Sequence, residues 1–274
     1  MQDIVGNYYV LNNSVDTLKE DFTIDYEKST FYEVIRIIDG VPLFFEEHYN
    51  RLKNSMNILD LNLKCSKQEL KSSIKKLIEV YGSPDCNVKI NIYDSEGEQN
   101  CLLYISKSYY PPKEEVEKGI GVSLLKLERN NPNVKIINTS YKEAVSKKMN
   151  ETGAFEILLV NEDGKVTEGS KSNVFFVRGT KVFTSPGEYV LKGITRQYII
   201  DVCKRLELEV VETLIDIVSL SEMEGLFISG TSIKVLPVST VDSFVFSSGS
   251  HPTIIDIRDQ FDKFIDDYVS RNRE

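Results

Sequence analysis

A carboxylate followed by small polar residues interrupts a strand-like segment in the second half of the chain. In "GKVTEGSKSNVFFV" (164–177), β-forming residues flank Glu168 and the polar stretch 169–173. Glycine, serine and asparagine favour turns, so the stretch is typical of an exposed turn. The alternative is a place where a ligand approaches the backbone and meets the carboxylate. The segment alone leaves both interpretations open.

Three other features have the donors that a phosphate group requires. Residues 193–195 begin a predicted helix, whose first N–H groups and positive dipole end attract anions. Residues 230–232 (Gly-Thr-Ser) interrupt a predicted strand with backbone and hydroxyl donors. Arg51 lies at the edge of a helical apolar stripe. Each alone has an ordinary explanation, such as a loop glycine or an arginine that extends to solvent.

Composition narrows the possible chemistry. The net charge of -9 argues against binding to nucleic acid, and no apolar run is long enough to span a bilayer. The N-terminus lacks a signal pattern, so we expect a cytoplasmic protein. Two histidines and four cysteines without metal-type spacing predict no metal site and leave little scope for a Ser-His-Asp triad. Nucleotide-binding glycine motifs are missing. Lysine, carboxylate and arginine, or a cofactor, must then carry any catalysis.

Hydrophobic periodicity predicts the elements that position these residues. The Asp39-Gly40 turn joins two strands within residues 30–45, and a helix follows at 48–59. A capping box of Ser66 and Glu69 begins a helix that ends at Gly82. Further strands are predicted at 87–94, 101–110, 121–127, 155–160, 172–177, 181–185 and on both sides of 230–232, with helices at 139–152, from 193 and from 251.

The organisation predicted is a mixed α/β (α+β) chain of two domains. A small α+β domain occupies residues 1–110, the charged and proline-containing segment 111–119 is a linker, and a larger strand-rich domain occupies 120–274.

Five segments together resemble a known family. They are "FYEVIRIIDGVPLFFEEHYNRLKNSM", "NPNVKIIN", "FEILLVNEDGKVTEGSKSNVFFV", "LKGITRQ" and "FISGTSIKVLPV". In order and spacing they resemble the fold-type IV pyridoxal-phosphate enzymes, which include branched-chain and D-amino acid aminotransferases and aminodeoxychorismate lyases. The resemblance runs from about residue 25 to the C-terminus.

The resemblance implies a role for each matching residue. Lys135 would form the Schiff base with pyridoxal 5'-phosphate, and Glu168 would face the pyridine nitrogen. The phosphate ligands would be Arg51, Ile194, Thr195 and Thr231. Tyr32 would line the substrate pocket and Ser232 would lie near the substrate carboxylate. A homodimer, with the site between the two domains, is also implied.

These roles agree with the chemistry of the residue types. A lysine amine condenses with the cofactor aldehyde and can act as base at the substrate Cα when burial and cationic neighbours lower its pKa. An anionic Glu168 keeps the ring nitrogen protonated, so that the ring accepts the electrons left at Cα. A carboxylate at this position is therefore what the cofactor requires.

Strand alternation adds two candidates for substrate binding. On strand 31–38, Tyr32 and Arg36 share one face, and Lys89 belongs to the polar face of strand 87–94. We predict that Arg36 or Lys89 binds a substrate carboxylate. The alternative is that the Lys89 face is open to water.

Departures from the family pattern bear on the reaction. The Arg and His of D-amino acid aminotransferases are missing from "DSEGEQNC" (94–101), and Val34 replaces a threonine typical of the lyases. Lys89 stands where branched-chain enzymes have arginine, and Lys234 replaces an acidic or small residue.

The sequence therefore predicts an aminotransferase that moves an amino group from an amino acid, with branched-chain or aliphatic L-amino acids favoured, to a 2-oxo acid. Aminodeoxychorismate lyase and D-amino acid aminotransferase activities are the alternatives within the family. A non-catalytic protein that binds pyridoxal phosphate, or a scaffold without ligand, is the alternative outside it.

Overall fold

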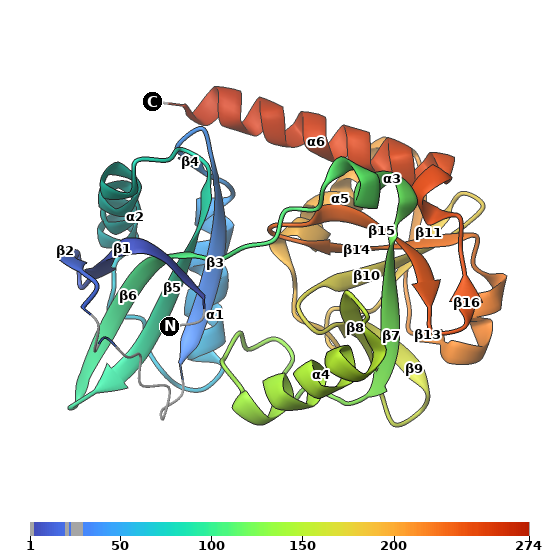
Figure 1. Ribbon diagram of the computed structural model, residues 1–274, viewed down its shortest axis with the longest axis horizontal. Coiled ribbons are helices and arrows are strands. Elements are labelled where there is room, and N and C mark those ends of the chain that lie inside the picture. Colours follow the sequence, from blue (N-terminus) through green and yellow to red (C-terminus); the bar gives the residue numbers. More distant parts are fainter. Residues whose placement is uncertain (1–2, 20–21, 23–29, 274) are drawn as a thin grey trace. The chain divides into compact units, whose positions relative to one another are not determined.

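A computed structural model describes residues 3–19, 22 and 30–273 (Figure 1). The chain divides into two compact units. Unit 1 contains the described residues up to Tyr109, Val134–Ile137 and the residues from Ile265 onward; unit 2 contains Tyr110–Asn133 and Asn138–Phe264. Residues 25–29, where the family resemblance begins, lie outside the described residues. The lysine segment 134–137 thus belongs to the unit built mainly from the first 109 residues.

In its described part, unit 1 has a six-stranded antiparallel sheet with strand order β2-β1-β6-β5-β3-β4. The predicted hairpin and the strands at 87–94 and 101–110 are confirmed, although the last strand ends at Ser106. The N-terminal hairpin was not predicted; it turns at Asn12 and Asn13, whose φ angles of 48° and 66° suit asparagine. The strands are β1 (Ile4–Leu11), β2 (Ser14–Thr17), β3 (Phe31–Ile38), β4 (Val41–Pro42), β5 (Cys86–Ser95) and β6 (Glu98–Ser106).

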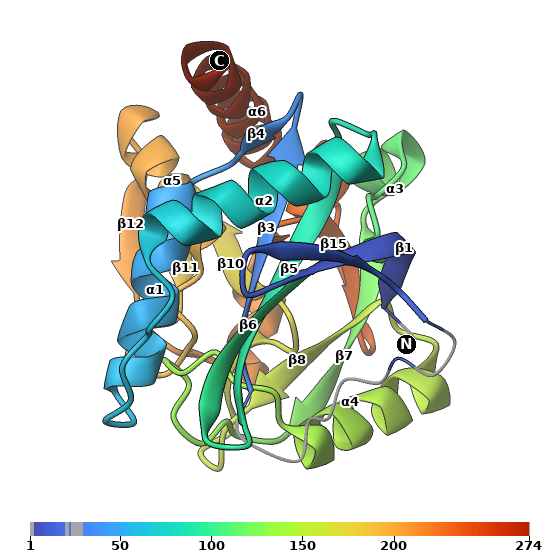
Figure 2. The ribbon, with the colours of Figure 1, turned by 90° about the vertical axis from the view of Figure 1, so that its left-hand side faces the viewer.

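Helices α1 (Phe45–Asn57) and α2 (Lys67–Tyr81) cover one face of this sheet, and α2 lies across β6 and β1 (Figure 2). The predicted capping box is present, because the Ser66 side chain accepts from Glu69 N and the Glu69 carboxylate accepts from Ser66 N. Gly82 ends α2 with a φ of 75°. These contacts confirm both predicted limits of the helix.

Strand β3 alternates between the two faces of the sheet as predicted. Tyr32, Val34 and Arg36 are half-buried on the face opposite the helices. The intervening side chains, buried beneath α1, are Phe31, Glu33, Ile35 and Ile37. A carboxylate thus lies among apolar side chains in the core of unit 1.

The described part of unit 2 has a ten-stranded mixed sheet with order β12-β11-β10-β14-β15-β7-β8-β9-β13, and β16 pairs with β15. Parallel pairs join β7 to β8, β7 to β15 and β11 to β12. The strands are β7 (Ile120–Lys126), β8 (Glu156–Val160), β9 (Lys165–Gly169), β10 (Asn173–Arg178), β11 (Lys181–Thr184), β12 (Glu209–Glu212), β13 (Ile215–Asp216), β14 (Gly225–Gly230), β15 (Lys234–Val241) and β16 (Phe244–Val245).

The helices of unit 2 confirm the three that were predicted. They are α4 (Thr139–Thr152), α5 (Ile194–Arg205) and α6 (Pro252–Asn272), of which the residues from Ile265 belong to unit 1. The predicted linker contains the short helix α3 (Lys113–Lys118), and two 3-10 helices, η1 (Ile217–Glu222) and η2 (Ser248–Ser250), complete the unit. The mixed α/β class is thereby confirmed. Among the described residues, no helix has both the length and the apolar run needed to cross a bilayer.

Candidate active site

Lys135 lies on a short segment that extends the edge of β3. Tyr32 N donates to Lys135 O at 3.1 Å, Ile137 N donates to Thr30 O at 2.9 Å, and Phe31 and Ile136 form a β-bridge. Lys135 N donates to the Ser55 hydroxyl of α1 at 3.2 Å. The Lys135 Nζ lies 4.6 Å from the centre of the Tyr32 ring. The lysine backbone is therefore fixed, and its amine lies against the side chain predicted to line the substrate pocket.

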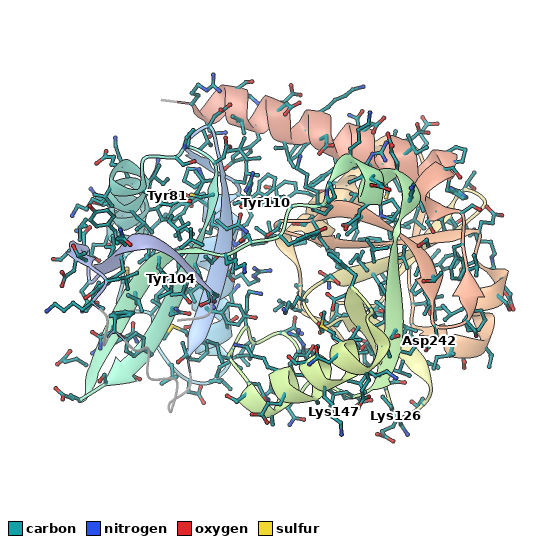
Figure 3. All side chains as sticks on the ribbon, in the orientation of Figure 1. Tyr81, Tyr104, Tyr110, Lys126, Lys147 and Asp242 are labelled. Carbon is teal, nitrogen blue, oxygen red and sulfur yellow. The ribbon has the colours of Figure 1, made fainter. Side chains whose placement is uncertain are left out.

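The same sheet face carries the two predicted carboxylate-binding candidates. Lys89 is 8% exposed and forms an ion pair with Asp3. Its Nζ lies 5.8 Å from the Tyr32 ring centre and 5.6 Å from that of Tyr104, which is labelled on β6 in Figure 3. Arg36 pairs across β3 and β5 with Asn87, and is also half-buried. The alternative of a water-open Lys89 face is therefore wrong.

Asn91 on this face has an unusual environment. It pairs directly with Tyr32 across the two strands and is fully buried. Within the part of the chain that the structure describes, neither its amide nitrogen nor its amide oxygen has a hydrogen-bond partner. An unpaired buried amide costs about 1 to 3 kcal/mol, so this side chain offers a donor and an acceptor to a ligand.

On the helix-covered face, the Glu33 carboxylate binds Arg51. Arg51 Nε donates to one oxygen at 2.7 Å and a terminal guanidinium nitrogen donates to the other at 2.6 Å. His48 Nδ1 lies 2.8 Å from the second oxygen. The predicted phosphate ligand Arg51 is thus held in one orientation by a buried bidentate ion pair.

These contacts explain the protonation of the cluster. Burial alone would raise the pKa of Glu33, but the charge and hydrogen bonds of Arg51, together with His48, hold that pKa well below its usual value. Burial lowers the pKa of His48, Arg51 and Lys135 lower it further, and Glu33 opposes them. At neutral pH the carboxylate is charged and the imidazole is neutral, so its Nδ1–H donates to Glu33.

In unit 2, Glu168 lies at the end of β9 and is 2% exposed. Its Oε2 accepts from Leu191 N at 3.1 Å. Its Oε1 lies 3.3 Å from Arg129 Nε, and Arg129 also donates to Ser170 O at 2.6 Å. The structure therefore shows a buried anion whose charge Arg129 compensates, rather than a carboxylate on an exposed turn.

Asn173 connects this strand end to helix α5. Its amide donates to Leu191 O at 2.9 Å, and a Cβ at Gly193 would lie only 2.0 Å from its Oδ1. Glu168 and Asn173 are the two ends of the E-G-x-x-x-N motif, which residues 168–173 form. They thus hold the loop before α5 from both sides. No side chain caps α5 among the described residues, whereas Ser66 and Asn138 cap α2 and α4. The helix end at Ile194 and Thr195 is therefore positioned and uncapped.

The residues between Glu168 and Asn173 form a structured turn around a second carboxylate. Both oxygens of Glu156 accept hydrogen bonds, from the hydroxyls of Ser170 and Ser172 and from Lys171 N at 3.2 Å. A Cβ at Gly169 would lie 2.0 Å from the Ser172 Oγ, so any other residue there would displace the Ser172 side chain from Glu156. Tyr141 donates to Ser170 O at 3.0 Å, and burial raises its pKa to about 12, with Arg129 opposing.

The β14–β15 turn lies beside this loop. Asn173 pairs with Ser229 in the sheet, and a Cβ at Gly230 would lie 3.7 Å from Lys171 O. Thr231 and Ser232 in the turn are half-buried. In the described structure, the buried Ser229 hydroxyl has no hydrogen-bond partner.

Lys234, which departs from the family pattern, has a φ of 52° and forms an ion pair with Asp262 of α6 at 2.8 Å.

The predicted residues therefore form two groups, one in each unit. Unit 1 brings Lys135 together with Tyr32 and contains, on the same or the helix-covered face, Arg36, Lys89 and Arg51. Unit 2 gathers the loops that carry Glu168, Ile194, Thr195, Thr231 and Ser232. Arg196 of "GITR" points elsewhere, since it binds Ser185 O and Glu212.

Sequence reasoning missed three charged residues that support these groups. Glu33 had a signal, because a carboxylate shares a strand face with Ile35 and Ile37 opposite a helix that carries an arginine. Glu156 and Arg129 had none, since no local pattern connects them to partners 14 and 41 residues away. Among the residues described, no cluster of three or more His, Cys, Asp or Glu could hold a metal ion.

Comparisons with known proteins identify the family. The family model for amino-transferase class IV matches residues 30–241. This chain therefore belongs to the class IV aminotransferase family, whose members are pyridoxal-phosphate enzymes, and its general activity is that of an aminotransferase.

Curated relatives include two kinds of aminotransferase. The D-alanine aminotransferase of Bacillus licheniformis is 28% identical over 230 residues, covering 80% of this chain and 81% of the relative. The probable branched-chain-amino-acid aminotransferase of Thermotoga maritima is 28% identical over 260 residues, covering 91% and 92%. The probable branched-chain-amino-acid aminotransferase of Aquifex aeolicus is 30% identical, covering 76% of this chain and 72% of the relative.

Solved structures share the fold. The Escherichia coli branched-chain amino acid aminotransferase has a TM-score of 0.83 at 23% identity and covers 94% of each chain. The enzyme of the same name from Thermobaculum terrenum has a TM-score of 0.84 at 22% identity and covers 97% and 95%. A further branched-chain enzyme, solved with pyridoxamine 5'-phosphate, has a TM-score of 0.84 at 24% identity and covers 95% and 94%. The fold-type IV architecture that the sequence predicted is confirmed.

Replacing Glu33 by glutamine tests the buried ion pair. Because the pKa of Glu33 is depressed, its stabilisation is fully present at pH 7 and is lost only as the pH falls through the folded-state pKa. We expect Glu33→Gln to lower the free energy of unfolding at pH 7 by about 3 kcal/mol, because it leaves Arg51 without its anion. Urea denaturation measures the change.

The matched control is Glu98→Gln, since Glu98 and its partner Lys64 have side chains that are 85% and 65% exposed. We expect less than about 1 kcal/mol for that variant. Equal effects in the two variants would contradict a stabilising role for the Glu33 pair.

Proposed function

We propose that this aminotransferase binds pyridoxal 5'-phosphate covalently through Lys135, with Glu168 as the partner of the ring nitrogen. The observation that carries the proposal is the fixed segment 134–137, which holds the Lys135 amine 4.6 Å from the Tyr32 ring centre in a member of a pyridoxal-phosphate family. The proposal includes a homodimer, as the sequence resemblance implies, and a cytoplasmic location.

The residues present fit the cofactor. A ring nitrogen that must stay protonated needs a buried anion, and Glu168 is one. A phosphate needs cationic and backbone N–H donors. Arg51, whose Nε and one terminal nitrogen hold Glu33, adds a guanidinium cation, and α5 begins without a capping side chain. The Ser229 hydroxyl, which has no partner within the described structure and precedes Thr231 by two residues, adds a buried donor. Each group that the cofactor requires thus has a matching side chain or helix end.

When bound, pyridoxal phosphate supplies an aldehyde that condenses with amines and a ring that accepts the electron pair of the substrate Cα. Lys135 contributes an amine that binds the cofactor and then moves a proton at Cα. Tyr32 lies against that amine and limits its orientation. Glu168 contributes fixed negative charge, which Leu191 N and Arg129 hold in place.

For the amino donor, we propose a branched-chain or other aliphatic L-amino acid. The Thermotoga maritima and Aquifex aeolicus relatives, named as probable branched-chain enzymes, support this choice. A D-alanine donor is the second candidate, supported by the Bacillus licheniformis relative. The missing Arg and His in "DSEGEQNC" favour the first candidate.

Chemical labelling tests the attachment point. Protein loaded with pyridoxal phosphate and reduced with borohydride should carry the pyridoxyl group on the peptide that contains Lys135. Lys135→Ala should lose this label, the near-ultraviolet to visible absorbance band and at least about 10³-fold in activity. Lys147 is exposed on α4 (Figure 3), and Lys147→Ala should behave as the wild type. A label on another lysine would refute the assignment.

Cofactor analogues test the role of Arg51. Arg51→Lys keeps a cation beside Glu33, but a single ammonium group cannot hold both Glu33 oxygens and also reach a phosphate, as the larger guanidinium can. We expect its Kd for pyridoxal phosphate to rise about 10-fold, and its Kd for pyridoxal, which has no phosphate, to change less than about 2-fold. Absorbance titration measures both, with Arg178→Lys, at an exposed position, as control. Equal weakening of the two ligands would contradict a phosphate contact.

Steady-state kinetics test the carboxylate candidates. We expect Arg36→Ala or Lys89→Ala to raise the KM of acid substrates about 10-fold or more, because a charge-assisted hydrogen bond is lost. Branched-chain L-amino acids and D-alanine, each with 2-oxoglutarate, should be compared as donors. Lys147→Ala again serves as control. An unchanged KM for every acid substrate in both variants would eliminate the two residues, and faster turnover of D-alanine would reverse the substrate proposal.

A further inference from the structure

Two cysteines in unit 1 line one cavity that the aminotransferase chemistry does not use. The cavity measures about 170 Å³ and lies near the start of α2, the β1–β2 turn and β6. Cys65 is half-buried, whereas Cys101 is buried. The remaining lining residues are Asn12, Asn13, Lys64, Glu69, Ser73 and Gln99.

Hydrogen bonds hold the Cys65 backbone beside β6. Lys64 N donates to Gln99 Oε1 at 2.7 Å, and Gln99 Nε2 donates to Asn62 O at 3.0 Å. The Tyr49 hydroxyl donates to Cys65 O at 3.2 Å. The loop before α2 is therefore attached to the strand that carries the second thiol.

Hydrogen bonds to Asn12 hold the backbone of Cys101, which also lines the cavity. Its N–H donates to Asn12 Oδ1 at 2.9 Å, and its carbonyl accepts from Asn12 N at 2.9 Å. Cys65 lines the same cavity and packs against the apolar cluster that contains Cys101. A disulfide requires two sulfurs that can approach without a large backbone rearrangement, and both backbones are held at the same cavity.

The two thiols differ in reactivity. The hydrogen bond from Cys101 lowers the pKa of Cys65, against the opposing effects of burial and Glu69. The same hydrogen bond raises the pKa of Cys101 well above its usual value, and burial and the Cys65 and Glu69 charges raise it further. Burial raises the pKa of Cys86 to about 11 and that of Cys203 to about 12. Of the four cysteines, Cys65 is the one that is not fully buried and whose pKa is lowered, so it is the expected nucleophile, and Cys86 and Cys203 are internal controls.

We propose that Cys65 is an oxidant-sensitive thiol and that Cys101 resolves it as an intramolecular disulfide. The Cys65 thiolate attacks a hydroperoxide oxygen; the S–O bond forms, the O–O bond breaks, and the alcohol or water leaves with a proton. The Cys65 sulfur loses two electrons and the peroxide gains them. The Cys101 sulfur then attacks the sulfenic sulfur; the S–S bond forms, the S–O bond breaks, and the Cys101 proton leaves with the hydroxyl as water.

Oxidation of the full-length protein with hydrogen peroxide, followed by alkylation and peptide mapping without reductant, tests the proposal. We expect one linked pair of peptides, Cys65 with Cys101, that dithiothreitol separates, while Cys86 and Cys203 remain alkylated thiols. Before oxidation, Cys65 should react with iodoacetamide about 10-fold faster than Cys86 or Cys203 at neutral pH.

Two variants separate the steps. Cys101→Ser should stop at a sulfenic acid on Cys65 that dimedone traps. Cys65→Ser should leave Cys101 reduced at the same peroxide dose. Retention of all four thiols, oxidation of Cys86 or Cys203 at the rate of Cys65, or a link between two chains would each overturn the proposal. None of these measurements depends on aminotransferase activity.

Discussion

The buried carboxylate of Glu33 in unit 1 determines how helix α1 packs on the sheet. Glu33 points to the helix-covered face of the sheet, where its strand neighbours are Phe31, Ile35 and Ile37. An ionised carboxylate there costs several kcal/mol unless charges and hydrogen bonds compensate it. The α1 side chains His48 and Arg51 provide that compensation. The interaction therefore fixes the orientation of α1 on the sheet, and with it the position of the Arg51 guanidinium.

Unit 2 uses buried carboxylates in a different way, because they bind backbone N–H groups of loops as well as side chains. Glu168 binds Leu191 N in the loop before α5, and Glu156 binds Lys171 N in the motif turn. A loop whose polar groups are satisfied by buried anions has few alternative conformations. The helix end that follows it is fixed without a capping side chain from the described residues, so that its N–H donors are available to an anion. The same contacts therefore position the start of α5 and leave its N–H groups available to an anion.

Local patterns in the sequence predicted most helices and strands. The elements that were missed have no such local pattern. The capping box at Ser66 and the Asp39-Gly40 turn are short-range signals, which depend on residues a few positions apart. The β1–β2 hairpin was missed because β2 is exposed throughout and the burial of β1 does not alternate. The pairing of residues 134–137 with β3 could not be predicted, since it joins segments about a hundred residues apart. The partners of Glu156 and Glu168 lie closer, at separations of 14 and 23 residues, but no local pattern connects them either.

The polar stretch 169–173 forms a turn, and the residues at the two ends of the motif bind the loop before α5. The inner residues form the turn, except that Ser170 and Ser172 bind the buried Glu156 instead of water. The flanking residues do something that an exposed turn does not require, because Glu168 and Asn173 both bind Leu191. An asparagine or serine in a solvated turn can be replaced. Here the side chains of Glu168, Ser170, Ser172 and Asn173 each have a buried partner. The spacing of the motif is therefore set by the geometry of one loop: its two ends must reach the same residue, and its middle must turn around a second carboxylate.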